Sequence, residues 1–100
     1  MTAPFGQRVR MNCATTREVY PDWTHNSYPL FVNGEIDISQ RSQYSVEKSV
    51  SGQYDLVIEK VTAAEAGVYK CIDNAGIGSV LVTYVLTVTG NNEQESQCYI

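Results

Sequence analysis

The chain has 100 residues, which is enough for one domain with its own apolar core. Hydrophobic residues make up 43% of it and charged residues 18%, a composition that excludes a disordered chain, and no apolar run approaches the roughly 20 residues that cross a bilayer. The net charge is −4 and Lys and Arg form no cluster, so neither membrane insertion of this segment nor a nucleic-acid partner is expected.

Alternation of apolar and polar residues predicts strands along the whole chain. Residues 7–14 place Val9, Met11 and Cys13 on one face, and Trp23 begins the next strand after a polar loop. Further strands are expected at 30–32, 35–38, 44–46, 54–58, 68–72 and 79–88.

Turn signals separate these strands. The Asn33-Gly34 pair predicts a type I′ hairpin, because both residues tolerate positive φ angles. Ala63 to Ala66 is too short for a stable helix and is interpreted as a turn. About eight or nine short strands without a βαβ unit indicate an all-β sandwich or barrel over residues 1–89, followed by a polar tail or linker at 90–100.

Four core residues have a distinctive spacing. Cys71 lies 58 residues after Cys13, Trp23 lies ten residues after the first cysteine, and Tyr69 lies two before the second. This pattern, together with the string from Leu56 to Cys71, resembles the V-set and I-set domains of the immunoglobulin superfamily. The resemblance continues to Leu86-Thr87-Val88 and so covers nearly the whole chain.

The resemblance implies a two-sheet Greek-key sandwich with a disulfide between Cys13 and Cys71. Trp23 would pack on that disulfide, and the Tyr69 hydroxyl would close a corner of the chain. Closing such a loop stabilises a domain by about 4 kcal/mol on the chain-entropy model. A bond of this kind persists in oxidising compartments and predicts an extracellular protein; two reduced core cysteines, as in intracellular muscle immunoglobulin domains, are the alternative.

The subtype stays open between V-set and I-set. The Asn33-Gly34 hairpin implies the extra C″ strand of V-set domains, whereas the short cysteine spacing resembles I-set. Residues 75–79 also resemble the joining segment of antigen-receptor variable domains, including primitive variable-joining domains of invertebrate chordates. Glu65 stands where the family usually has Asp, and Arg41 is the candidate ion-pair partner, because Gln43 holds the usual Arg position.

The chain offers little for chemistry. His25 is its one histidine, no set of residues has metal-ligand spacing, and no Gly-rich phosphate loop opens a helix. His25 shares the face of Trp23 and is expected to pack at the edge of the core. We therefore expect no catalytic residues, metal or cofactor, and no enzyme activity.

Strand alternation predicts an exposed contact surface on the sheet of strands C, F and G. If Trp23, Cys71 and Leu86 face the core, their neighbours face outward. In the variable family this sheet face pairs two domains, and the residues expected on it are Thr24, Asn26, Lys70, Ile72, Leu81, Thr83 and Val85, joined by Leu30 or Phe31 from strand C′. Asn26 would lie near a twofold axis; scattered surface apolar residues on a monomer are the alternative.

The sequence thus favours an extracellular protein-recognition module, of the immune-receptor or cell-adhesion type. Its expected partner is a second copy or another immunoglobulin-type domain, bound through the sheet face or through loops 14–22, 33–43 and 73–78. The alternative is a spacer domain in a larger adhesion or muscle protein. Cys98, the odd cysteine, is a candidate for an interchain disulfide.

Overall fold

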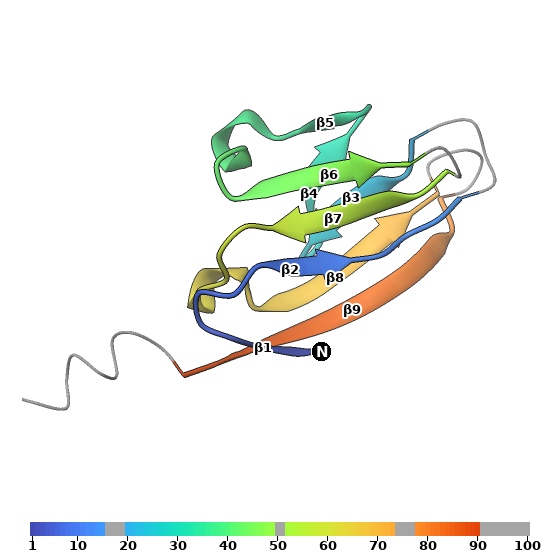
Figure 1. Cartoon of the computed structure of the whole chain (residues 1–100). Coiled ribbons are helices and arrows are strands. Elements are labelled where there is room, and N and C mark those ends of the chain that lie inside the picture. The colour runs from blue at the N-terminus through green and yellow to red at the C-terminus, as the bar shows by residue number, and fades with distance from the viewer. Residues whose placement is uncertain (16–19, 50–51, 74–77, 91–100) are drawn as a thin grey trace, which may run out of the picture.

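The computed structural model describes residues 1–15, 20–49, 52–73 and 78–90 (Figure 1). Within these ranges nine strands form two sheets that face each other, and the only helical segments are two short 3₁₀ turns. The all-β sandwich predicted from the sequence is confirmed.

The larger sheet has six strands in the order β1-β9-β8-β3-β4-β5. β1 is parallel to β9, and the other neighbours are antiparallel. Their bounds are β1 Thr2–Pro4, β9 Val80–Thr89, β8 Gly67–Ile72, β3 Asp22–His25, β4 Tyr28–Val32 and β5 Glu35–Ile36.

The smaller sheet has the order β2-β7-β6, with β2 Val9–Met11, β7 Tyr54–Ile58 and β6 Tyr44–Lys48. The 3₁₀ turns are η1, Ile38–Gln40, and η2, Ala63–Glu65. The strand expected to reach residue 38 therefore ends at Ile36, because the Asp37 side chain accepts the Ser39 amide and begins η1. The Asn33-Gly34 turn has the predicted positive φ angles of 55° and 82°.

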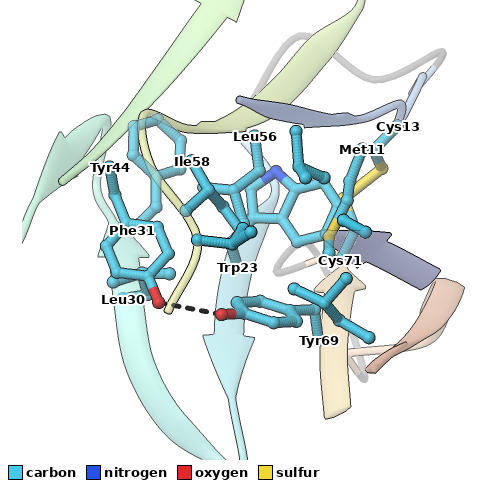
Figure 2. Close-up of a cluster of buried hydrophobic side chains, with 14 residues drawn as sticks. Met11, Cys13, Trp23, Leu30, Phe31, Tyr44, Leu56, Ile58, Tyr69 and Cys71 are labelled. Atoms are coloured by element: carbon cyan, nitrogen blue, oxygen red, sulfur yellow. Dashed lines mark hydrogen bonds between the residues drawn. A yellow bond between two sulfur atoms is a disulfide. The ribbon is translucent and has the colours of Figure 1, made fainter. Parts of the chain in front are cut away.

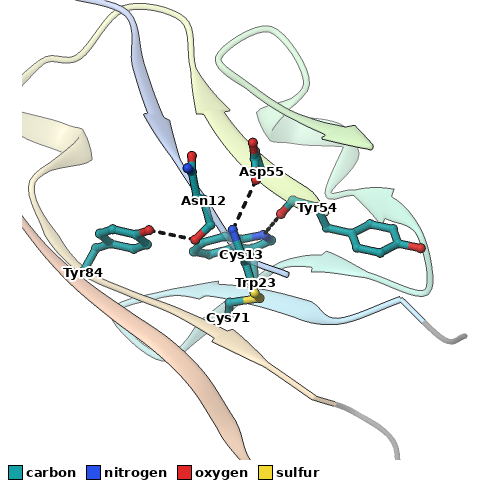
Figure 3. Close-up of a disulfide and its surroundings, with 7 residues drawn as sticks. All are labelled: Asn12, Cys13, Trp23, Tyr54, Asp55, Cys71 and Tyr84. Atoms are coloured by element: carbon teal, nitrogen blue, oxygen red, sulfur yellow. Dashed lines mark hydrogen bonds between the residues drawn. A yellow bond between two sulfur atoms is a disulfide. The ribbon is translucent and has the colours of Figure 1, made fainter. Parts of the chain in front are cut away.

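The two sheets are joined by the Cys13–Cys71 disulfide, as the sequence predicted. Cys13 follows β2, Cys71 lies in β8, and their Cα atoms are 6.5 Å apart. Trp23 is fully buried beside this bond and stacks on Tyr84, with ring centroids 6.2 Å apart (Figure 3). The buried residues of the core are Ala3, Val9, Met11, Cys13, Trp23, Leu30, Phe31, Tyr44, Leu56, Ile58, Val61, Tyr69, Cys71 and Leu86.

Tyr44, Tyr69 and His25 pack together at the end of the core beside η2. The Tyr69 hydroxyl donates to the Glu65 carbonyl at 2.6 Å, the expected corner, and lies 2.8 Å from the Tyr44 hydroxyl (Figure 2). The His25 ring stacks on Tyr69 at 4.3 Å, and its Nε2 lies 2.9 Å from the Ala66 carbonyl oxygen. His25 is thus a packing residue, as the sequence indicated.

Glu65 is used locally and not by Arg41. Its carboxylate accepts the Thr62 amide at 2.7 Å and the Thr62 hydroxyl at 2.6 Å, a capping box for η2. Arg41 instead lies 3.8 Å from the Glu35 carboxylate and donates to the Ile36 carbonyl at 3.4 Å. The hypothesis that Arg41 reaches Glu65 is therefore wrong.

The Asp55 side chain replaces one backbone hydrogen bond beyond the end of β2, between Cys13 and Tyr54. The Tyr54 amide donates to the Cys13 carbonyl at 2.7 Å, but the Tyr54 carbonyl accepts the Trp23 indole N–H at 3.0 Å (Figure 3). The Cys13 amide donates instead to the buried Asp55 carboxylate at 3.2 Å, and Arg10 approaches the same carboxylate at 2.9 Å. One carboxylate thereby frees a backbone carbonyl for Trp23.

The outer face of the smaller sheet is charged. Arg8 and Arg10 both contact Glu47, and Arg8 also lies 3.3 Å from Glu59. Hydrogen bonds to Glu47, the larger cause, and to Asp55 raise the pKa of Arg10. The hydrogen bond from Arg10 lowers the pKa of Glu47. Exposed pairs of this kind stabilise a fold only weakly.

Replacing Asp55 is therefore expected to destabilise the domain more than replacing an exposed acid of the same face. In Asp55→Ala the buried Cys13 amide loses its acceptor, and we expect a loss of about 2–3 kcal/mol in the free energy of unfolding. Glu59→Ala, the matched control, should cost less than about 1 kcal/mol. Urea unfolding of both variants measures the difference, and equal losses would contradict this role of Asp55.

The tyrosine pair predicts loss of stability in alkali. Burial raises the pKa of both Tyr44 and Tyr69 above the ordinary value of about 10. Because the folded state holds these protons more tightly, the stabilisation is complete below that pH and is lost as the pH rises above it. Absorbance of tyrosinate, followed with circular dichroism, should show the two groups ionising only as the fold is lost; ionisation in the intact fold would refute the prediction.

Candidate functional site

On the larger sheet, residues that pair directly across β3, β8 and β9 form rows, which we call rungs. Directly paired residues share a face, and Trp23 and Cys71 form a buried rung. The neighbouring rungs therefore face outward. They comprise Asp22, Ile72 and Val80; then Thr24, Lys70 and Thr83; then Val68 and Val85.

A β-bulge changes which apolar residues lie on this face. Cys71 pairs with Val82 and Ile72 pairs with Val80, so Leu81 is an extra residue between two rungs. Alternation along the sequence had assigned Leu81 outward and Val80 inward. The structure places Val80 beside Ile72, and the exposed fractions of Val80, Leu81 and Val85 are 50%, 39% and 56%. Val68 opposite Val85 was also missed from the predicted set.

Leu30 and Phe31 do not belong to the exposed face, and their assignment to it is wrong. A second bulge pairs Trp23 with Phe31 and Thr24 with Pro29, which leaves Leu30 as the extra residue. Both side chains are only 3% exposed and enter the core (Figure 2). The exposed large hydrophobic residues of β4 are instead Tyr28 and Val32.

Asn26 lies at the end of β3 and has a local structural role. Its φ is 51°, that of Ser27 is 69°, and the two residues form the tight turn into β4. The Asn26 side chain accepts the Val68 amide at 2.9 Å and lies over Gly67, where an added Cβ would come within 2.5 Å of its Oδ1. Asn26 is exposed, but its carbonyl oxygen is already engaged within the chain.

Thr24 and Lys70 occupy the middle of the face. They pair directly, and Thr83 completes their rung. The Thr24 hydroxyl oxygen is buried and has no hydrogen-bond partner among the residues that the structure describes. One polar rung with a single cation thus separates the Val68–Val85 rung from the rung of Asp22, Ile72 and Val80.

A groove along β4 and β5 adds a second apolar region that sequence reasoning did not find. It has a volume of about 550 Å³ and is lined mainly by apolar side chains from β4, β5 and η1. Tyr28, Val32 and Ile38 on its rim are large hydrophobic residues with exposed fractions of 61%, 37% and 75%. Only folding brings Ile38 of η1 beside β4, so no periodicity could have predicted this groove.

Several expected sites lie partly or wholly outside the described residues. Residues 16–19 of the first predicted loop, 74–77 of the third, most of the joining-like segment, and 91–100 of the tail with Cys98 belong to this group. In the described part of the chain no three or more His, Cys, Asp or Glu residues are arranged to hold a metal ion. No helix in that part is long and apolar enough to span a membrane.

Comparison with solved structures finds close structural matches. Dpr1 IG1, in a crystal structure bound to DIP-eta IG1, matches with a TM-score of 0.79 and 20% identity over 90% of this chain and 88% of that one. Duf (Kirre) D1 matches with a TM-score of 0.75 and 24% identity, over 89% and 88% of the two chains. The RIG-5 IG1 homodimer matches with a TM-score of 0.76 and 18% identity, over 90% and 89%.

No protein-family model matches the sequence, and comparison with curated proteins finds no match. The structural matches and the two-sheet topology together define the chain as an immunoglobulin-like domain. Two of the matched domains were solved in complexes with another IG1 domain.

The structural role of Asn26 gives a prediction. Asn26→Ala removes the acceptor of the Val68 amide and places alanine at positive φ, so we expect a loss of about 1–3 kcal/mol in the free energy of unfolding. Asn26→Asp, which keeps an acceptor oxygen, should lose less. Thermal or urea unfolding checks both variants, and an Asn26→Ala variant of native stability would contradict the role.

Proposed function

We propose that this domain is an extracellular protein-recognition module that self-associates through the outer face of β3, β8 and β9. The observation that carries the proposal is the exposed apolar surface of Val80, Leu81 and Val85, with the half-buried Ile72 beside Val80, on one sheet face. Such a surface, rimmed by polar residues, is typical of a protein contact. The groove lined by Tyr28, Val32 and Ile38 is a separate apolar region along β4 and β5 of the same sheet.

The contrast between the two sheets supports this choice of face. The outer face of the smaller sheet carries Arg8, Arg10 and Glu47 in mutual ion pairs, and covering it would desolvate every one of them. The outward rungs of β3, β8 and β9 carry two charged side chains, Asp22 and Lys70, among threonines, valines and Ile72. Burial there removes mostly apolar surface from water and is favourable.

The disulfide supports an extracellular location, because such bonds persist in oxidising compartments. Pairing of β5 with β4 supports a V-set domain, since the strand after C′ is the feature that variable-type domains add. The proposed partner is a second copy, with another immunoglobulin-type domain as the next candidate. Contact between surfaces, and no catalysis, is the proposed activity.

A structural spacer domain is the second candidate, and the burial of Leu30 and Phe31 favours it by shrinking the expected apolar face. The two functions differ in the oligomeric state of the isolated chain. A recognition module should self-associate, whereas a spacer should stay monomeric at high concentration.

Val85→Glu tests the proposal, because it places a charge at the most exposed apolar position of β8 and β9. We expect the dissociation constant of the dimer, measured by analytical ultracentrifugation, to rise by at least about tenfold. The control Ser42→Glu adds the same charge in the exposed loop before β6 and should leave it unchanged.

The measurement is made with and without reductant, so that a covalent link through Cys98 is separated from association of the sheet faces. A native chain that stays monomeric at every concentration would refute self-association. A dimer that tolerates Val85→Glu would refute this face.

A further inference from the structure

β5 of the larger sheet and β6 of the smaller one lie next to each other at one side of the sandwich (Figure 1). Residues of both sheets line a second groove there. It has a volume of about 440 Å³, within the range of small-molecule sites. Its lining comes from both sheets: Phe31, Gly34, Glu35 and Ile36 from β4, the turn and β5, then Arg41, Tyr44, Ser45, Val46 and Lys48. We propose that this groove binds a small aromatic acid.

The apolar part of the groove is a wall of rings and branched side chains. Phe31 and Tyr44 are almost fully buried and belong to the core, and Ile36 and Val46 pack against them. The Tyr44 hydroxyl forms a hydrogen bond with the Tyr69 hydroxyl, which fixes the position of the Tyr44 ring. A preformed apolar wall of this kind favours a flat, rigid ligand, which loses little conformational entropy on binding.

Two cations flank that wall. The Arg41 guanidinium has five N–H donors, and its contacts are long ones, 3.4 Å to the Ile36 carbonyl and 3.8 Å to Glu35. The Lys48 ammonium lies 5.1 Å from the centre of the Tyr20 ring. Both cations can therefore turn toward an anion with little loss of existing hydrogen bonds.

Charge complementarity selects the ligand. The charged residues of the lining are two cations, Arg41 and Lys48, and one acid, Glu35. The Glu35 side chain is 77% exposed and so remains in water. The lining thus carries a net positive charge in a chain whose total charge is −4. A carboxylate or sulfonate can accept hydrogen bonds from Arg41, while the aromatic body covers Val46 and Ile36. This inference does not depend on the pairing face, which lies on the outer side of the larger sheet.

The test uses the whole chain and two fluorescent probes of nearly equal shape, anilinonaphthalene sulfonate and the neutral N-phenyl-naphthylamine. We expect the sulfonate to bind with a dissociation constant below about 1 mM. Its amide shifts in a nitrogen-15 spectrum should centre on Gly34, Ser45 and Val46. Shifts centred on Thr83 and Val85, or no binding, would overturn the proposal.

Variants of the two cations distinguish specific binding of the sulfonate group from non-specific binding of the dye. Arg41→Gln is expected to weaken sulfonate binding by about tenfold and to leave the neutral probe unaffected. Arg8→Gln is the matched control, since the exposed fractions of the Arg41 and Arg8 side chains are 55% and 52% and Arg8, just before β2, does not line the groove. Lys48→Gln should weaken the sulfonate in the same selective way.

Equal effects of Arg41→Gln and Arg8→Gln, or equal weakening of the two probes, would show that Arg41 does not hold the anion and would overturn the proposal. Circular dichroism of each variant confirms that the fold is retained. Failure of this test leaves the Val85→Glu experiment unaffected, because neither Arg41 nor Lys48 belongs to the rungs of β3, β8 and β9; Arg41 lines the groove along β4 and β5 as well.

Discussion

The buried rung of Trp23 and Cys71, tied to the other sheet through Cys13, is the constraint on which the rest of this domain depends. The disulfide holds the two sheets together, and Trp23 fills the space beside it. The indole also needs a hydrogen-bond acceptor, takes the Tyr54 carbonyl, and thereby leaves the Cys13 amide to Asp55. One large aromatic residue in the core thus determines the role of a buried acid in the central strand of the smaller sheet.

The same rung decides which side chains can meet a partner. Since side chains alternate across a strand, the rungs beside Trp23 and Cys71 must face outward. The two bulges then change the result at one position each. The bulge in β4 moves Leu30 into the core, and the bulge in β9 brings Val80 next to Ile72. The exposed apolar surface is therefore a product of both the disulfide rung and the irregularities around it.

The two outer faces and the side of the sandwich at β5 and β6 have different chemistry. The smaller sheet has a network of ion pairs, which favours contact with water. The larger sheet has valines, Ile72 and threonines in its outward rungs with two charged side chains, Asp22 and Lys70, which fits the proposed protein contact. The groove between β5 and β6 combines buried rings with two weakly engaged cations, which fits a small anion. Each surface follows from residue type and strand position, and none requires a change in fold.

Alternation and turn chemistry were enough to predict an all-β fold and the Asn33-Gly34 turn. The disulfide and the burial of Trp23 and Tyr69 were predicted from the resemblance of their spacing to that of immunoglobulin domains. Alternation along the sequence misplaced Leu30 and Val80, since a bulge inserts one residue without any local signal and reverses the alternation beyond it, whereas Leu81 is exposed as expected. Nor could the sequence predict that Arg41 would lie beside Glu35, or that Ile38 and Tyr28 would line one groove. Those contacts join segments that lie apart in the sequence, so they exist only once the tertiary structure packs these segments together.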